Sequence, residues 1–223
     1  MKKQFKKGFT LAETLITLGI IGVISALTIP TLVMNYQSKV RITQLQKVYN
    51  DISNAAVAAL ADERVDTLDY TYIYEDVDGA GAIQFLKKYL KVSKECTYSE
   101  CMASSYSSLD GSASGNVLSA DVQCVALSTG AVVCIPSVWA GDGYNNHGEI
   151  STVVDVNGKS GPNTNGRDLF QFNLYSDGSI GNSYGSPGDY VSSGDRCLDN
   201  ADQVTYGGSC FSKVVADGWK MDY

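Results

Sequence analysis

The feature that most constrains this chain is an uncharged, largely apolar run close to its N-terminus. No charged side chain occurs between Thr14 and Ser38. A helix over this run, rising about 1.5 Å per residue, exceeds the ~30 Å hydrocarbon core of a bilayer. Four lysines precede the run, so the short N-terminal end should stay cytoplasmic and the larger remainder should lie outside. These lysines are Lys2, Lys3, Lys6 and Lys7.

One acid, Glu13, lies at the start of this run, where hydrocarbon is expected. A cleaved secretory signal has an apolar region of about 7–15 residues and a small-residue cleavage site, and this run offers neither. A plain signal anchor fits the length but leaves the carboxylate without a role. An acid in an apolar segment usually marks a paired, functional group. We therefore expect Glu13 to meet a cation.

Charge is unevenly distributed along the chain. The 17 basic and 24 acidic residues give a net charge of -7. Residues 1–8 hold four lysines and no acid, so without these four positive charges the net charge falls from -7 to -11. The phosphates of nucleic acid would repel so acidic a body. The composition therefore argues against a nucleic-acid partner.

Six cysteines all lie after the apolar run. They are Cys96, Cys101, Cys124, Cys134, Cys197 and Cys210. No C-x-x-C pair occurs and the chain has a single histidine, which is a poor basis for a zinc site. An even number of cysteines beyond a membrane segment favours disulfides in an oxidising compartment, in agreement with the topology given by the lysines. Buried free thiols are the alternative.

The N-terminal pattern resembles a known family. Lys7-Gly8-Phe9-Thr10-Leu11-x-Glu13, followed by an apolar helix containing Pro30, looks like the type IV pilin-like family, which includes the pseudopilins of type II secretion. The resemblance implies cleavage after Gly8 by a membrane peptidase and methylation of the new N-terminal residue, Phe9. It also implies that Glu13 assists assembly by pairing with the N-terminal ammonium of a neighbouring subunit. Glu13 would then have the cation it needs.

The resemblance further implies partners and locations. The partners are copies of the chain itself, related minor pilins, a prepilin peptidase, inner-membrane assembly machinery and the lipid bilayer. The precursor would reside in the inner membrane with its head outside, and the assembled form would be a surface or periplasm-spanning filament. The resemblance is specific over residues 1–35 and only architectural beyond them.

After Lys39 the helical pattern becomes one-sided. Apolar residues recur at three- and four-residue intervals, at Ile42, Leu45, Val48, Tyr49, Ile52, Ala56, Ala59 and Leu60. This pattern predicts one continued helix, with a transmembrane and assembly half at 9–38 and an amphipathic half at 39–62 that lies against a sheet. Pro30 removes a backbone hydrogen bond within it, so we expect a kink or a loosened turn there.

The rest of the chain, 63–223, is predicted to be an extracytoplasmic head, and 1–8 a basic leader. Segment 80–91 reads as a short helix, and 124–134 as a β-hairpin. Segment 169–180 alternates phenylalanine and leucine with polar residues and ends in an Asp-Gly turn. These elements predict an α+β fold: a long N-terminal helix packed on a mainly antiparallel sheet, with a disulfide-bounded C-terminal region.

The hairpin suggests one disulfide. A three-residue loop with Gly130 in the left-handed conformation places Cys124 opposite Cys134. Directly opposed strand residues have Cα atoms ~4.5–5.5 Å apart, a separation that a disulfide accepts.

The other cysteines are paired by preference rather than by geometry. Cys197 and Cys210 would close a loop worth about 3 kcal/mol in the chain-entropy model, and the resemblance favours such a region at the end of the head. Cys96 and Cys101 remain as the third pair. Six cysteines permit many connectivities, so nearest-neighbour pairing is a preference.

Catalysis and metal binding have little support in the sequence. His147 is the sole histidine and lies in a Gly/Asn-rich loop, and no nucleophile elbow or phosphate-binding loop occurs. The segment 155–168 has calcium-like spacing of oxygen-bearing side chains, but Gly166 stands where an EF-hand needs Glu. Turn-forming residues explain this segment, so we predict no metal ligands and no cofactor, with calcium left as an open alternative. Segment 104–116 reads as an exposed loop.

The sequence as a whole predicts a structural, non-enzymatic subunit of a type IV pilus-like filament. A surface pilin and a secretion pseudopilin are both open, and so are major and minor roles. A membrane-anchored binding module or adhesin that never polymerises is the alternative from another class. A tethered enzyme lacks residues to support it.

Overall fold

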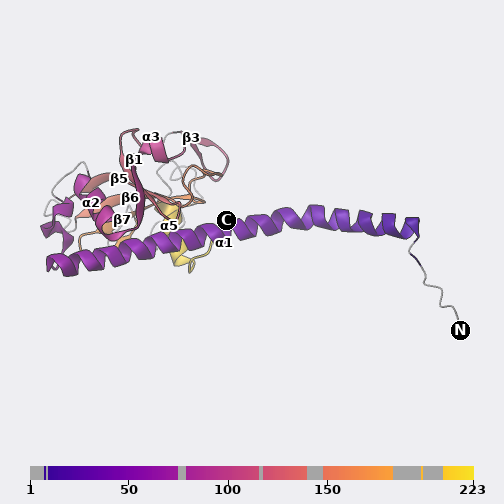
Figure 1. Ribbon diagram of the computed structural model, residues 1–223, viewed down its shortest axis with the longest axis horizontal. Helices are drawn as coiled ribbons and strands as arrows, with labels where there is room; N and C mark the ends of the chain where they lie inside the picture. Colours follow the sequence, from indigo (N-terminus) through magenta and orange to yellow (C-terminus); the bar gives the residue numbers. More distant parts are fainter. Residues whose placement is uncertain are drawn as a thin grey trace. The chain divides into compact units, whose positions relative to one another are not determined.

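The computed structural model describes residues 8, 10–74, 79–115, 118–139, 148–182, 197 and 208–223. Its longest element is the helix α1, Leu11–Glu63, as the sequence predicted (Figure 1). The chain divides into two compact units, one ending at Lys39 and the other beginning at Val40. Helix α1 therefore contributes to both units.

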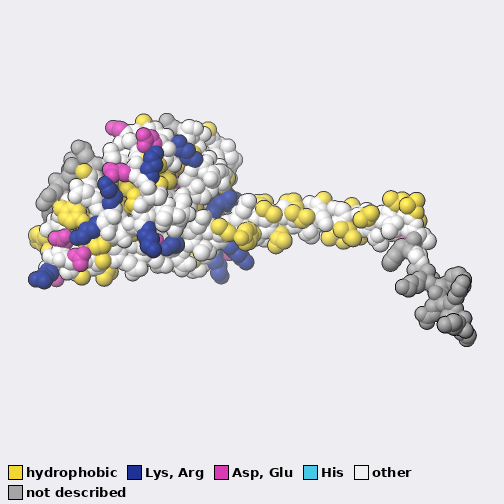
Figure 2. Space-filling model, viewed as in Figure 1, with side chains coloured by type: hydrophobic (Ala, Val, Ile, Leu, Met, Phe, Trp, Pro, Cys, Tyr) yellow, Lys and Arg dark blue, Asp and Glu magenta, His cyan; other side chains and the backbone are white. Residues whose placement is uncertain are grey.

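The first unit is the N-terminal part of α1. Its large apolar side chains are exposed, and Figure 2 shows several of them along the face of the helix that it draws. Apolar residues occupy every face of this part of the helix by sequence. Helix α1 continues through Pro30, where the sequence predicts a kink or a loosened turn. Proline lacks an N–H, so one carbonyl a turn earlier loses its usual donor there although the helical path continues.

The second unit is built on the amphipathic part of α1 and a six-stranded sheet. The predicted apolar stripe is buried, with Leu45, Val48, Ile52, Ala56 and Ala59 each 1% exposed or less. These side chains share one core with the sheet residues Val125, Val133, Val154, Phe170 and Phe172. The sheet thus supplies the partner that the stripe requires.

The sheet has the order β1-β4-β5-β6-β7-β8, and every neighbouring pair is antiparallel. The strands are β1 Val92–Thr97, β4 Gln123–Leu127, β5 Val132–Trp139, β6 Glu149–Asp155, β7 Leu169–Tyr175 and β8 Ile180–Gly181. The β4–β5 hairpin has the predicted register, with Cys124 opposite Cys134. Gly130 adopts φ 92° in its turn, a conformation that favours glycine.

Residues alternate between the two faces of the sheet. One face meets α1 together with α2, Ala80–Tyr89, and α5, Gly208–Ala216. The other face carries a smaller core, in which Cys124, Cys134 and Val153 pack with Tyr98 and Tyr106. The sheet is therefore covered on both sides.

The segment 104–116, predicted to be an exposed loop, is more ordered than that. It contains β2, Tyr106–Ser107, and β3, Ala113–Gly115, which pair as a separate antiparallel sheet. Tyr106 is 2% exposed. The serines and glycines of the segment led to the loop prediction, whereas the buried side chain of Tyr106 packs the segment against the head.

Two other features were not expected. Helix α5 was not predicted from the sequence. Its residues Phe211 and Val214 lie about one turn apart and are both buried. In β7 the polar residues of the alternation are buried too. Gln171 donates to Ser151 Oγ at 3.0 Å and Asn173 donates to Glu149 Oε2 at 2.8 Å, so the neighbouring strand supplies acceptors for their NH₂ groups.

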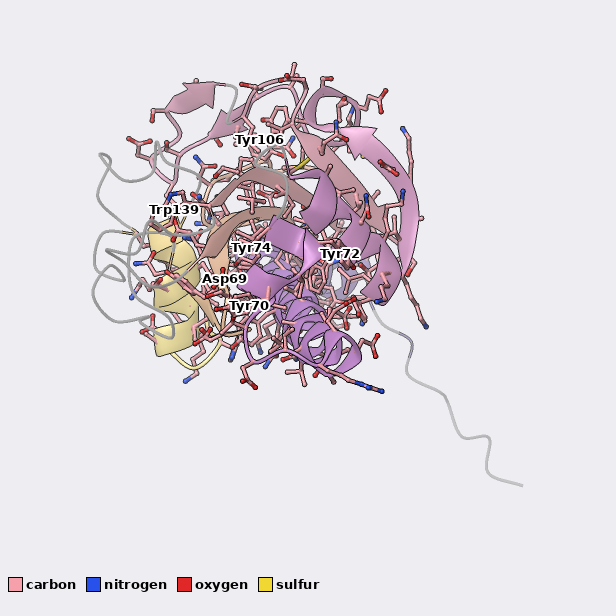
Figure 3. The ribbon with its side chains drawn as sticks, turned by 90° about the vertical axis from the view of Figure 1, so that its left-hand side faces the viewer. Asp69, Tyr70, Tyr72, Tyr74, Tyr106 and Trp139 are labelled. Carbon is pink, nitrogen blue, oxygen red and sulfur yellow. A yellow bond between two sulfur atoms is a disulfide. The ribbon has the colours of Figure 1, made fainter. Side chains whose placement is uncertain are left out.

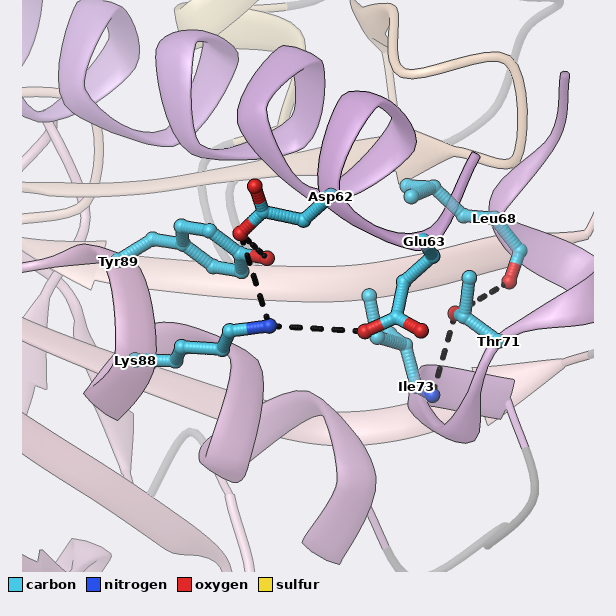
Figure 4. Close-up of polar contacts among 7 residues, drawn as sticks. All are labelled: Asp62, Glu63, Leu68, Thr71, Ile73, Lys88 and Tyr89. Carbon is cyan, nitrogen blue, oxygen red and sulfur yellow. Dashed lines mark hydrogen bonds and ion pairs between the residues drawn. The ribbon is translucent and has the colours of Figure 1, made fainter. Parts of the chain in front are cut away.

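The end of α1 is fastened to α2 by a small polar cluster (Figure 4). Lys88 Nζ lies 3.7 Å from Asp62 Oδ2 and 3.5 Å from Glu63 Oε1. Tyr89 donates to Asp62 Oδ2 at 2.9 Å. Beyond the helix, Thr71 Oγ1 donates to Leu68 O at 2.6 Å and shapes the two short turns η1, Leu68–Tyr70, and η2, Tyr72–Tyr74. The exposed ion pairs of Lys88 with Asp62 and Glu63 contribute little stability and mainly fix the position of α2 beside the end of α1.

Candidate functional site

The predicted processing site lies just before α1. Gly8 is exposed, and a Cβ added there would meet nothing within 4 Å. Phe9 and residues 1–7, which include the four leader lysines, lie outside the described residues. The described part of the chain therefore places no steric demand on glycine at position 8.

Glu13 takes part in a helix cap. Its Oε2 accepts from Thr10 N at 2.8 Å and from Thr10 Oγ1 at 2.9 Å, and its own N donates to Thr10 Oγ1 at 3.3 Å. This reciprocal arrangement is a capping box, with Thr10 as N-cap and Glu13 three residues later. The sequence reasoning missed the role of Thr10, although T-x-x-E before an apolar run is a recognised helix-start signal.

The cap leaves Glu13 able to bind a further group. A carboxylate offers about four acceptor positions, and both bonds from Thr10 go to one of its oxygens. The side chain is exposed, so a cation from outside the chain can reach it. Thr10 therefore holds the carboxylate at the first turn of the helix without using all of its capacity.

Other polar side chains of the first unit are satisfied locally. Thr14 Oγ1 donates to the carbonyls of Thr10 and Leu11, at 3.1 and 2.9 Å. Thr17 and Thr28 likewise donate to carbonyls three or four residues earlier. Hydroxyls bonded within their own helix need no external partner, whereas a carboxylate does. Glu13 is consequently the charged group of Leu11–Ser38 that any apolar environment must accommodate.

The first unit has the properties of a membrane-spanning segment by length and composition. Helix α1 contains an apolar window long enough to cross a bilayer, and none of that window is buried within the protein. Pro30 lies in this exposed region, about five helical turns from Glu13, so the two residues are not brought together within one chain.

The second half of α1 also carries an exposed face. Its solvent-facing positions follow a three- and four-residue spacing, at Thr43, Lys47, Asn50, Asn54, Val57 and Ala61. The single charged member, Lys47, is already paired with Asp51 at 3.0 Å. This stripe is therefore mostly polar and carries almost no net charge, as the solvent-facing side of an amphipathic helix can.

All six cysteines are paired. The pairs are Cys96–Cys101, Cys124–Cys134 and Cys197–Cys210, with Cα separations of 6.1, 4.0 and 4.5 Å. This is the nearest-neighbour pairing favoured by the sequence. The residues between Cys197 and Gly208 lie outside the described part of the chain.

The residues considered for catalysis or metal binding do not assemble a site. His147 lies outside the described residues. Within the described ranges, no group of three or more His, Cys, Asp or Glu side chains could hold a metal ion. Asp168, from the calcium-like segment, instead accepts the backbone N–H groups of Asn163 and Thr164, at 2.8 and 2.6 Å, as turn-forming carboxylates do.

Comparison with known proteins adds one finding. Residues 3–29 match the family model of the prokaryotic N-terminal methylation motif. No curated protein and no solved structure shows a significant match to the chain. The match covers Gly8, Phe9, Thr10 and Glu13. It identifies a prepilin-type N-terminus, consistent with the type IV pilin-like family, and does not extend to the head.

Proposed function

We propose that this chain, which carries the methylation motif of prepilins at residues 3–29, is a structural subunit of a type IV pilus-like filament. In this proposal it is inserted as a precursor, cleaved after Gly8, methylated at Phe9 and polymerised through α1. The leader is 1–8, the assembly half of the helix is 9–38, the amphipathic half is 39–62 and the head is 63–223.

The observation that carries the proposal is the exposed, capped Glu13 at the start of an apolar helix. Cleavage after Gly8 creates an ammonium four residues before this carboxylate. In hydrocarbon or in the core of a filament, each of these charges would be costly alone and acceptable as a pair. A subunit whose Glu13 meets the ammonium of a neighbouring copy satisfies both groups, and so gives this acid the cation it requires.

The surface of α1 supports the same proposal. The first half exposes large apolar side chains such as Leu18, Leu27 and Leu32, which need either lipid or other helices around them. The second half exposes the mostly polar stripe from Thr43 to Ala61. Helices of neighbouring copies that leave the bilayer would cover the apolar surface of the first half, which is not suited to prolonged contact with water.

The partners and locations follow from this assignment as parts of the proposal. The partners are a prepilin peptidase, inner-membrane assembly machinery, the bilayer, further copies of the chain and related minor pilins. The three disulfides support a head outside the cytoplasm. The motif is typical of structural proteins rather than enzymes. A surface pilus and a secretion pseudopilus remain as alternative settings, and a non-polymerising anchored module remains the rival function.

The decisive test replaces Glu13 with Val or Gln in cells that produce the full chain. Insertion and cleavage should continue for Glu13→Val, because the anchor becomes more apolar. The ratio of sheared filament to membrane-held mature subunit should fall at least tenfold, and Glu13→Gln should be intermediate because it keeps a hydrogen bond without the charge.

The matched control is Thr14→Val, which removes a hydroxyl that bonds only to carbonyls of its own helix. This variant should assemble at the wild-type ratio. A wild-type ratio for Glu13→Val, with cleavage confirmed by mass spectrometry, would exclude the assembly role of Glu13. Absence of sheared filament from cells that produce the wild-type chain would instead favour the anchored module.

A further inference from the structure

Two carboxyl groups are buried at neighbouring positions of the head. Asp155 ends β6 and Asp168 directly precedes β7, and the register places Asp155 opposite Leu169, the next residue. Both aspartates are 0% exposed. Burying two negative charges at neighbouring positions is costly, because each is desolvated and each repels the other.

The two carboxyl groups are not equally supported. Asp168 accepts two backbone N–H groups at short distance, from Asn163 and Thr164, which favour its charged form. Asp155 Oδ1 accepts the N–H of Asn157 at 3.0 Å, and its Oδ2 accepts the hydroxyl of Tyr106 at 2.7 Å. A tyrosine hydroxyl can also accept a hydrogen bond, so the Tyr106–Asp155 contact survives when Asp155 is protonated.

The groups that face this pair do not supply a compensating cation for Asp155. Among the described residues, the titratable groups acting on it are Tyr106 from β2 and Asp168. Arg41 of α1 acts on Asp168, and Tyr98 of α3 acts on Tyr106. Lys159 reaches Ser99 O at 3.5 Å. Burial first, and then the charge of Asp168, raise the pKa of Asp155 to about 7.

The pair also holds a part of the head in place. The loop whose N–H groups bind Asp168 pairs with β2: Ser107 N donates to Asn163 O and Asn165 N donates to Ser107 O, both at 2.9 Å. Tyr106, the neighbouring residue of β2, reaches Asp155 (Figure 3 shows its place away from the tyrosines of η1 and η2). The two aspartates therefore link β2 and the 163–165 loop to the sheet.

We propose that the Asp155–Asp168 pair is a proton-binding site of the folded head, in which one of the two carboxyl groups is protonated and the other charged, and that this site makes the head more stable in mild acid than in alkali. This inference does not depend on filament assembly. The proton resides on Asp155, and Asp168 keeps the charge because two backbone donors hold it.

The direction of the effect follows from linkage. A carboxyl whose pKa is higher in the folded than in the unfolded chain binds its proton more tightly when folded. Its stabilising contribution is complete below the unfolded pKa of 3.8 and is lost as the pH rises through the folded value near 7. Within that window the unfolding equilibrium constant rises about tenfold per pH unit.

The test is denaturant unfolding of the full chain in detergent micelles, followed by near-ultraviolet circular dichroism, at pH 5 and pH 8. Asp155→Asn imitates the protonated side chain and should remove this proton linkage. Relative to that variant, the wild-type unfolding constant should increase about a hundredfold between the two pH values. The matched control is Asp110→Asn, an exposed acid that binds the N–H two residues later as Asp155 does. It should keep the wild-type dependence.

A second measurement covers the case in which Asp155→Asn does not fold. Carboxyl ¹³C NMR of wild-type protein labelled at aspartate should show one buried resonance that titrates between about pH 6 and 8, and Tyr106→Phe should move its midpoint upward. Absence of a resonance titrating above pH 5 overturns the proposal, and so do parallel pH dependences of wild type and Asp155→Asn. Recovery of the lost stability at pH 8 by calcium ion also overturns it, because the pair would then bind a metal cation.

Discussion

The two halves of helix α1 use apolar side chains in opposite ways. In the unit up to Lys39 these residues surround the helix and stay exposed, whereas from Val40 onward they form one stripe and are buried by a sheet. The apolar side chains of the first half need lipid or other helices to cover them, whereas those of the second half are covered by the sheet of the same chain. The same helix thus joins an exposed apolar surface to the core of the head.

The largest effect should come from Gly8→Val. This variant tests whether glycine at position 8 is required by a processing peptidase rather than by the folded chain. The free chain has room for a side chain there, since an added Cβ meets nothing within 4 Å. A peptidase site that needs close approach of the backbone should reject valine, so the protein should accumulate as full-length precursor on immunoblots.

Gly19→Val is the control for this prediction, because its surroundings are equally open and it lies away from the cleavage site. It should be processed normally. Mature Gly8→Val protein beginning at Phe9 would show that the peptidase assignment is wrong.

The next effect separates the two halves directly. Leu45 is 0% exposed and Leu18 is 66% exposed. Leu45→Ala should lower the free energy of unfolding of the head by about 2–5 kcal/mol, because it removes buried contacts and leaves a cavity. Leu18→Ala should leave that free energy within about 0.5 kcal/mol of wild type. Equal effects of the two substitutions in denaturant titrations would contradict the division of α1 into a half with exposed apolar side chains and a half buried in the head.

A smaller effect is expected from the disulfides, which occur in the head alone. Replacing both Cys124 and Cys134 with alanine should cost the head about 3 kcal/mol and leave insertion of the first unit unchanged. Unfolded, unreduced wild-type protein should contain no free thiols by chemical titration. Four or more free thiols would exclude the disulfide framework and the oxidising location that it supports.

The smallest effect concerns the cap of α1. Thr10→Val removes the N-cap hydroxyl that binds Glu13 Oε2 and accepts from Glu13 N. Amide exchange in the first turn should accelerate about threefold to tenfold, the range expected for a lost cap. Thr17→Val, whose hydroxyl bonds to Thr14 O alone, should leave that turn unchanged. Equal exchange rates in the two variants would mean that the cap does not order the helix start.

The sequence by itself determined the features that depend on local pattern. The apolar run and its lysines indicate the membrane segment, the three- and four-residue spacing after Lys39 gives the buried stripe, and the turn at Gly130 fixes the register of Cys124 and Cys134. Each of these follows from the geometry of a helix or a hairpin, which neighbouring residues define alone.

Only the tertiary structure decided the features that need distant residues. Tyr106 becomes a core residue because β6 brings Asp155 to it from 49 positions away. Gln171 and Asn173 are buried where a hydroxyl and a carboxylate of the neighbouring strand accept from their NH₂ groups, which no alternation of residue types reveals. Helix α5 forms where Phe211 can stack on Phe172, with ring centroids 4.8 Å apart. Burial of a polar or aromatic group is stabilising only with its partner in place, and folding alone supplies that partner.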